Sequence, residues 1–126
     1  MDYRYMSSEW VRGLSTDETA DVFSLCVMLC ELIDGRHPLG RVPAHEPRYG
    51  PDIDTLMRIR DLDYALPAQD TPLVRVIRAN LVRDPRTRMS VDQCRRALLD
   101  AARDAGLEVG PDAIAALRSA IERARR

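Results

Sequence analysis

Two histidines are the side chains of this 126-residue chain best suited to act as general bases or metal ligands near neutral pH. His37 lies in the segment GRHPL and His45 in PAHEP, and both segments have the composition of loops. Neither segment carries a serine or cysteine that could serve as a nucleophile. We therefore expect these histidines to form no catalytic triad and no metal site.

Three cysteines are the other candidate nucleophiles and metal ligands. Cys26 and Cys30 are four residues apart and would share one face of a helix, but a metal site would need two more ligands, which we do not find nearby. We interpret both, together with Cys94, as small buried hydrophobic residues, and expect no metal and no cofactor. Because the chain shows neither a secretion signal nor an apolar run long enough for a bilayer, we expect reduced thiols in a cytoplasmic protein.

The charges of the chain are nearly balanced. It has 19 basic and 20 acidic residues, a formal net charge of −1, and 45% hydrophobic residues, as in an ordinary globular domain. This balance favours neither a nucleic acid nor an anionic membrane as a partner. The arginine-rich segment RSAIERARR, residues 118–126, includes a glutamate, and we interpret it as a solvated helix face. Every basic residue is arginine, so no reaction here can use a lysine.

Hydrophobic residues recur with helical spacing along the chain, and no segment alternates as a strand would. The sequence therefore predicts an all-α fold. Residues 40–51 contain several prolines and glycines and are expected to be a loop. The expected helices are residues 6–12, 19–34, 52–60, 71–82, 90–105 and 111–125.

Capping residues mark several of these helix ends. Gly35 is expected to stop the long helix, for which Thr16 or Asp17 is the candidate N-cap. Thr71, followed by a proline, and Ser90 are expected to cap the two helices that follow. The expected inner face of the last of these carries Val91, Cys94, Leu98 and Ala101 or Ala102.

Three segments have the order and separation of known motifs. YMSSEWVRG, residues 5–13, resembles the end of a protein-kinase activation segment. DVFSLCVMLCELIDGRHPL, residues 21–39, resembles helix F of that family, and LVRDPRTRMS, residues 81–90, resembles the turn before its last helix. Over residues 3–102 the chain resembles the C-terminal, helical lobe of bacterial Hanks-type Ser/Thr protein kinases, in a truncated, pseudokinase-like form. The resemblance implies an incomplete kinase C-lobe, with helices like F to I, plus an extra C-terminal helix.

The resemblance assigns roles to several residues. Glu9 matches the glutamate of Ala-Pro-Glu and Arg88 the arginine that pairs with it, which implies a buried structural ion pair. The alternative is two unrelated surface charges. Asp21 matches the helix F aspartate, which binds the catalytic loop in the family, and it could instead be a carboxylate near a helix start. Met28 and Leu32 match positions under the family's internal spines, for which simple core packing is the alternative.

The chemistry of phosphoryl transfer is missing from the chain. It contains no Gly-x-Gly-x-x-Gly loop, no lysine, no His-Arg-Asp and no Asp-Phe-Gly sequence. Ser8 and Met89 replace family prolines and Cys26 replaces a glycine. We therefore expect no enzyme activity and no ATP binding from this chain alone.

We divide the chain into a kinase C-lobe-like domain, residues 1–105, and an additional helix, residues 106–126. That helix carries an apolar stripe that could fold back over the long helix, pair with a second chain, or remain an exposed tail. The candidate partner surface comprises Met28, Leu32, Ile114, Leu117 and Ile121.

Two functions follow from the resemblance. The first is a non-catalytic interaction or regulatory module in signalling, whose partner is a kinase, a kinase substrate or a second copy of the chain. The alternative is one half of a split Ser/Thr kinase that needs a second chain. Asp21, the segment Tyr5–Met6 and Glu31, which matches a position that can face substrate, motivate this alternative.

Overall fold

The computed structural model describes residues 2–41 and 50–106. Within these ranges every regular element is helical and no strand is present, as the sequence predicts. The elements are η1 (Tyr3–Tyr5), α1 (Ser8–Val11), α2 (Thr19–Asp34), α3 (Ile53–Arg60), α4 (Pro72–Asn80), η2 (Pro85–Thr87) and α5 (Val91–Asp104). In this part of the chain no helix combines the length and the hydrophobicity that crossing a membrane requires.

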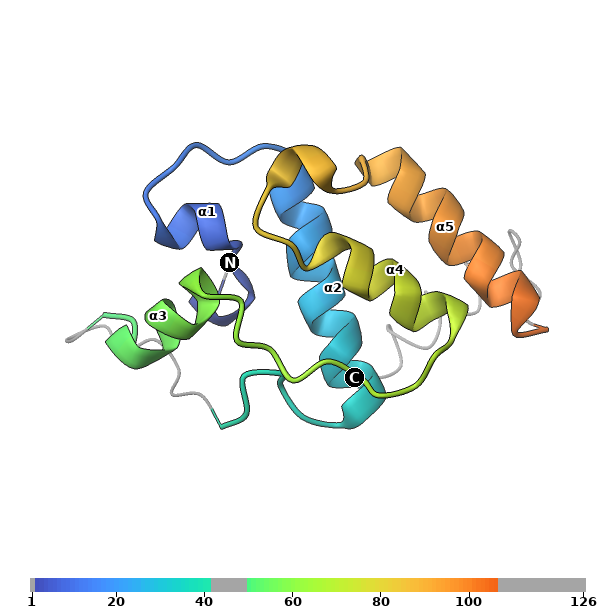
Figure 1. Cartoon of the computed structure of the whole chain (residues 1–126), viewed down its shortest axis with the longest axis horizontal. Coiled ribbons are helices and arrows are strands. Elements are labelled where there is room, and N and C mark those ends of the chain that lie inside the picture. Colours follow the sequence, from blue (N-terminus) through green and yellow to red (C-terminus); the bar gives the residue numbers. More distant parts are fainter. Residues whose placement is uncertain (1, 42–49, 107–126) are drawn as a thin grey trace, which may run out of the picture.

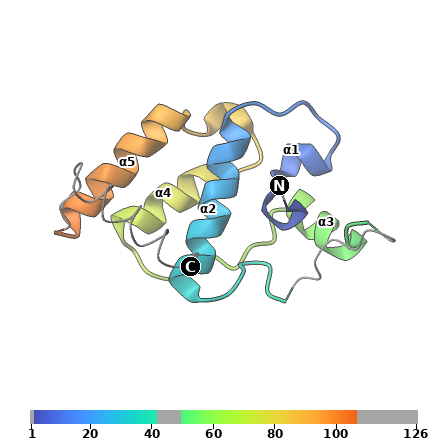
Figure 2. The same cartoon turned by 180° about the vertical axis from the view of Figure 1, so that it is seen from behind.

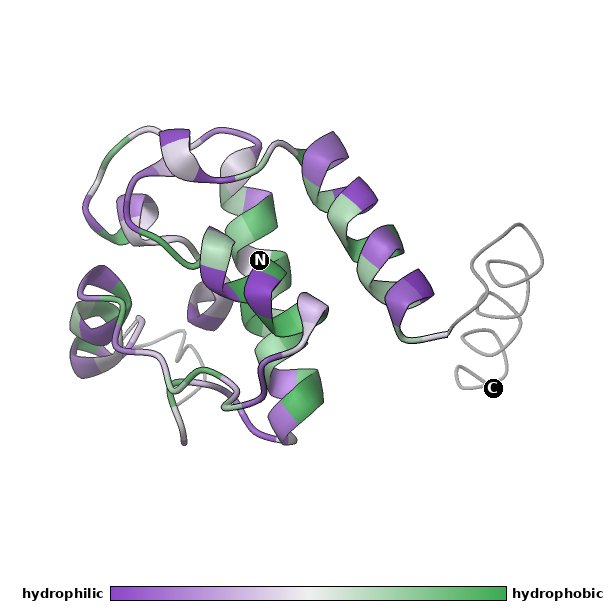
Figure 3. Cartoon of the chain, turned by 45° about the vertical axis from the view of Figure 1, so that its right-hand side comes forward, coloured by the Kyte–Doolittle hydropathy of each residue, from purple (hydrophilic) through white to green (hydrophobic). Residues whose placement is uncertain are grey.

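Helix α2 is the centre of the molecule (Figure 1). Helices α1 and α3 lie on one side of it and helices α4 and α5 on the other, and the opposite view shows the same arrangement (Figure 2). Hydrophobic residues recur along α2 between these helices (Figure 3). The other described helices are arranged around this one helix (Figure 1).

Different contacts fix the two ends of α2. At the C-terminus, Gly35 adopts a left-handed conformation with φ of 72°, and its N–H donates to the carbonyl of Glu31 at 2.8 Å. At the N-terminus, the N-cap is Glu18, whose side chain makes no capping bond, so the expectation of Thr16 or Asp17 is wrong. The Asp17 carboxylate nevertheless accepts the N–H of Thr19, the first residue of α2, at 2.8 Å.

The remaining helix starts follow the sequence more closely. Thr71 accepts the N–H of Val74 at 3.2 Å, with Pro72 at the first position of α4. Ser90 accepts the N–H of Gln93 at 3.1 Å, and the Gln93 side chain accepts the Ser90 N–H at 2.9 Å, which is a capping box. The expected helix 6–12 is wrong in its bounds, because the chain forms the 3-10 turn η1 and the shorter α1 instead.

The main core lies between α2, α4 and α5. All three cysteines belong to it and are free and buried. Burial raises the pKa of the Cys26 thiol to about 12 and that of the Cys30 thiol to about 11, so both stay protonated at neutral pH. The buried members of this core are Val22, Phe23, Cys26, Val27, Cys30, Val76, Ile77, Leu81 and Cys94.

A second, smaller core joins the N-terminal segment to α3. It is formed by Tyr3, Leu39 and Ile59, with Met6, Val11 and Leu56 packed against it. The expected inner face of α5 is wrong at one position, because Val91 is 47% exposed at the start of the helix. Cys94 and Ala101 of the same face are buried, at 2% and 8% exposure.

Candidate functional site

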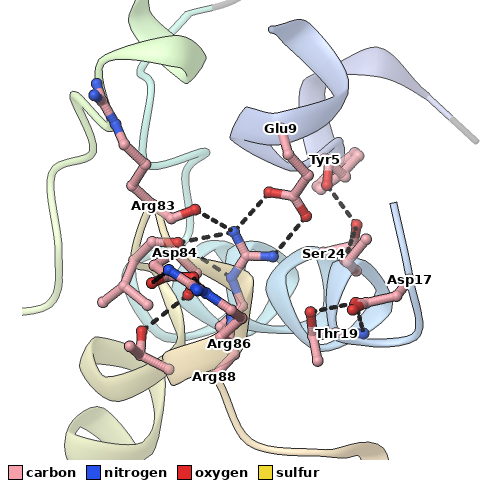
Figure 4. A network of polar contacts seen from close by, with 12 residues as sticks. Tyr5, Glu9, Asp17, Thr19, Ser24, Arg83, Asp84, Arg86 and Arg88 are labelled. Carbon is pink, nitrogen blue, oxygen red and sulfur yellow. Dashed lines mark hydrogen bonds and ion pairs between the residues drawn. The ribbon is translucent and has the colours of Figure 1, made fainter. Parts of the chain in front are cut away.

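Glu9 and Arg88 form the ion pair that the sequence predicts. Arg88 Nη1 donates to Glu9 Oε1 at 2.7 Å, and Nη2 donates to Oε2 at 2.8 Å (Figure 4). The two side chains are 2% exposed or less. This bidentate geometry is among the strongest that a carboxylate and a guanidinium can adopt.

The guanidinium of Arg88 also holds the turn that precedes α5. Its Nε and Nη2 donate to the carbonyl of Val82 at 3.1 and 2.8 Å, and Nη2 reaches the carbonyl of Arg83 at 3.4 Å. Its central carbon lies 4.8 Å from the centre of the Phe23 ring on α2. One side chain therefore ties together α1, α2 and the segment between α4 and α5.

The electrostatics of the pair favour the ionised state of Glu9. Burial works to raise the pKa of the Glu9 carboxyl group, but the hydrogen bonds and charge of Arg88 outweigh burial, and the pKa lies below its ordinary value. Both carboxylate oxygens accept from Arg88, whose Nε and Nη2 also donate to backbone carbonyls, and both side chains are buried. The pair is therefore structural, since neither group is available to a substrate.

Asn80 supports the same turn and has no counterpart in the sequence-based predictions. It is fully buried at the end of α4, where its amide donates to the carbonyl of Val76 at 2.8 Å. Its side-chain oxygen accepts the N–H of Met89, the neighbour of Arg88, at 2.8 Å. An asparagine near a predicted helix end is usually an exposed cap or turn residue, so the sequence alone carried no signal for this buried role.

Tyr5 fixes the segment before α1 against the C-terminal half of α2. Its hydroxyl donates to Glu31 Oε2 at 2.7 Å, and its carbonyl accepts the Ser24 hydroxyl at 2.6 Å. The ring of His37 meets that of Tyr5 edge-on, with centroids 5.1 Å apart. Glu31 is thereby held at the surface of α2.

His37 is bound as a neutral side chain in a structural role. Its Nδ1 accepts the Leu39 N–H at 3.1 Å, so the proton is on Nε2, which lies 3.0 Å from the carbonyl oxygen of Arg4 and donates to it. Burial lowers the pKa of His37 below its ordinary value of 6.5. In the described ranges, no three His, Cys, Asp or Glu side chains are grouped to hold a metal ion.

One face of α2 is left uncovered by the described residues. Leu25, Met28 and Leu32 are 38%, 37% and 77% exposed, so the alternative that Met28 and Leu32 are simple core residues is wrong. They follow one another at steps of three and four residues, which places them along a single stripe. Large apolar side chains grouped at a surface commonly mark an interaction site.

Two grooves lie along this stripe. The first, the α2–α5 groove, has a volume of about 340 Å³ and is lined by Asp21, Val22, Leu25, Val91, Cys94, Arg95 and Leu98. The second, the Tyr5–Leu32 groove, has a volume of about 240 Å³ and is lined by Tyr5, Met28, Glu31 and Leu32. The first lies at the N-terminal half of α2 and the second at its C-terminal half.

Helix α2 is acidic wherever it is charged. Asp21, Glu31 and Asp34 are its charged residues, and the helix contains no arginine. Asp21 lies in the first turn, at the rim of the α2–α5 groove, where a negative charge suits the helix dipole. Within residues 2–41 and 50–106, its carboxylate meets no hydrogen-bond donor and no cation.

The sequence-predicted site residues thus separate into three groups. Glu9 and Arg88 are joined in a buried pair, whereas Asp21, Met28 and Leu32 share the open side of α2. Ile114, Leu117 and Ile121, like His45, lie outside the described residues. None of the protein-family models compared with the chain matches it.

Proposed function

We propose that the chain is a non-catalytic, kinase-C-lobe-like module that acts in the cytoplasm by binding another protein through the Tyr5–Leu32 groove. The observation that carries the proposal is the exposure of Leu32 and Met28 on the central helix, beside a glutamate that is held in place. Removal of an exposed leucine side chain from water by a partner lowers the free energy of the complex.

Several features support the kinase-like part of the proposal. The three motif segments lie on the segment before α1 and α1 itself, on α2, and on the turn before α5, and every regular element of the described residues is helical. The residues that match Ala-Pro-Glu and its arginine, Glu9 and Arg88, are paired over a long distance in sequence. Scaffold residues of the resemblance are thus present while the residues for ATP and catalysis are absent from the sequence.

The chemistry of the groove indicates the kind of partner. Its apolar residues are flanked by Glu31, and Asp34 lies one turn beyond on the same helix, so a partner with basic and apolar residues fits best. Two copies of the chain meeting through this face would bring glutamates of like charge together, which costs free energy. Among the three partner classes considered, a kinase or a kinase substrate is therefore favoured over a second copy.

Affinity capture with matched variants tests the proposal. Leu32→Asp changes a residue that is 77% exposed in the groove, and Ile53→Asp changes one that is 71% exposed on α3, away from it. We expect proteins captured by the wild type from cells of its source to be lost with Leu32→Asp and kept with Ile53→Asp. Equal capture by all three proteins would contradict the proposed surface.

The split-kinase alternative has one observation in its favour, the exposed Asp21 carboxylate without a partner in the described part of the chain. A second polypeptide with a catalytic loop could supply its hydrogen-bond donors. The test is transfer of labelled phosphate from ATP by the chain together with its captured partner. Transfer that is lost with Asp21→Asn would favour the split kinase, whereas binding of the partner without transfer favours the interaction module.

A further inference from the structure

We propose that residues 111–126 bind back into the α2–α5 groove of the same chain. This groove and the Tyr5–Leu32 groove share no lining residue, so the inference does not depend on the proposed function. The proposed occupant of the groove is this segment of the same chain. The test below distinguishes it from a second copy or a different protein.

The walls of the α2–α5 groove need an apolar cover. Leu25 of α2 and Val91 of α5 face each other across it at 38% and 47% exposure, and Leu98 continues the α5 wall. Below them lie Val22 and Cys94, which belong to the main core. A helix laid along the groove would extend this core by one layer and remove the exposed side chains from water.

The connection from α5 permits such a helix. Gly106 has a φ of 78°, a left-handed conformation in which the chain can reverse after the last turn of α5. Residues 106–110 then form a link of the length that joins antiparallel neighbouring helices, and Pro111 suits a first helical position. At a rise of about 1.5 Å per residue, a helix of residues 111–125 would be about 22 Å long, close to the length of α5.

The apolar residues of the segment match the groove in kind and spacing. Ile114, Leu117 and Ile121 recur at steps of three and four residues, so on a helix they form one narrow stripe. A narrow stripe suits a groove between two helices better than a flat surface, because both of its flanks meet apolar walls. Five of the other positions are alanines and, after Pro111, the rest are polar, so the stripe carries the only large apolar side chains of the segment.

The charges set the direction. The N-terminal ends of α2 and α5 lie at the same end of the molecule (Figure 1), and that end of the groove carries Asp21. An antiparallel return along α5 would bring residues 118–126 there, with four arginines and one glutamate. Asp21, which has no partner among the described residues, would then face arginines, and the dipoles of the returning helix and α5 would be opposed favourably.

Limited proteolysis of the full chain by trypsin tests the inference, because Arg118 and Arg123 lie within the segment. We expect cleavage after these arginines to be about tenfold faster in Val91→Gln than in the wild type, since an open segment is cut in proportion to its population. Gln adds no charge opposite the arginines and is a good helix former, so α5 should be retained. Leu25→Gln, the second groove variant, should act in the same direction, and circular dichroism verifies the fold of each.

Two controls make the result specific. Ile53→Asp, on α3, should leave the cleavage rate unchanged. Ile114→Asp should also accelerate cleavage, because it removes from the groove one of the apolar side chains of the segment. Equal rates in the wild type and both groove variants, or no effect of Ile114→Asp, would overturn the inference. Protection from trypsin that grows with protein concentration would also overturn the inference, because it would mean that a second copy of the chain occupies the groove.

Discussion

Arg88 and Glu9, 79 residues apart in the sequence, form a buried bidentate ion pair with nitrogen–oxygen distances of 2.7 and 2.8 Å. The pair fastens α1 to the turn before α5, and Arg88 continues the contact to Phe23 of α2. It therefore fixes the N-terminal segment beside α2, where Tyr5 in turn holds Glu31. The candidate binding groove depends on this arrangement without containing either member of the pair.

Replacing Arg88 should destabilise the fold strongly. Arg88→Met leaves the Glu9 carboxylate buried and unpaired, and we expect the free energy of unfolding to fall by about 3–5 kcal/mol. Urea unfolding followed by circular dichroism measures the change. Arg75→Met is the matched control, because Arg75 pairs with Asp70 at the surface, with side-chain exposures of 64% and 75%, and should change stability by less than about 1 kcal/mol. Equal losses in the two variants would disprove the structural role of the buried pair.

The contribution of Glu9 should depend on pH. Its pKa in the folded state is lowered from the ordinary value of 4.5, so the unfolded chain takes up the proton first as the pH falls. The stability contributed by this ionisation is fully present above that ordinary value and is lost as the pH falls through the folded pKa. The difference in unfolding free energy between the wild type and Glu9→Gln should therefore shrink on acidification. A difference that stays constant with pH would be inconsistent with a lowered pKa.

His37 should make the protein less stable in mild acid. Its Nδ1 accepts the Leu39 N–H, a bond that protonation removes, and its folded pKa lies below 6.5. Because the unfolded chain binds the proton more readily, stability should decline as the pH falls from about 7 through the ordinary histidine pKa. The urea midpoint of the wild type should fall over this range more than that of His37→Gln. Parallel pH profiles would show that His37 does not couple protonation to folding.

Asn80 should contribute to the stability of the turn before α5. In Asn80→Leu the part-buried Met89 N–H loses its acceptor, and leaving such a donor unsatisfied costs about 1–3 kcal/mol. Ala79→Leu, on the exposed side of the same helix, should change the unfolding free energy by only about 0.5 kcal/mol. Urea unfolding of the two variants measures both changes in the free energy of unfolding. A tolerated leucine at position 80 would mean that Met89 finds another acceptor.

The sequence predicted local features of the fold well and its long-range consequences unevenly. The bounds of α2 and the caps at Thr71 and Ser90 follow from helical periodicity and from side chains that bond their own neighbours. The shortening of the expected helix 6–12 to Ser8–Val11 could not be foreseen, because the carbonyl of Tyr5, just before it, is held by Ser24 from α2. Tertiary contacts there override local propensity.

The candidate site shows the same division. The pairing of Glu9 with Arg88 was predicted from a resemblance in motif spacing, and no local property of either residue would have shown it. The exposure of Leu32 and Val91 could not be read from hydrophobicity, because a leucine or valine on a helix stripe looks the same whether or not another element covers it. The positions of α4, α5 and the N-terminal segment around α2 decide which part of its surface is covered.

Site-specific photo-crosslinking in cells can show whether another protein binds at the Tyr5–Leu32 groove. A photoreactive phenylalanine analogue placed at position 32 would lie in the Tyr5–Leu32 groove, and the same residue at position 53 would lie on α3 with similar exposure. We expect a discrete adduct of higher mass from position 32, formed with another protein, and none from position 53. The same adducts from both positions, or none from position 32, would contradict the proposal that the chain works by binding a protein through this face of α2.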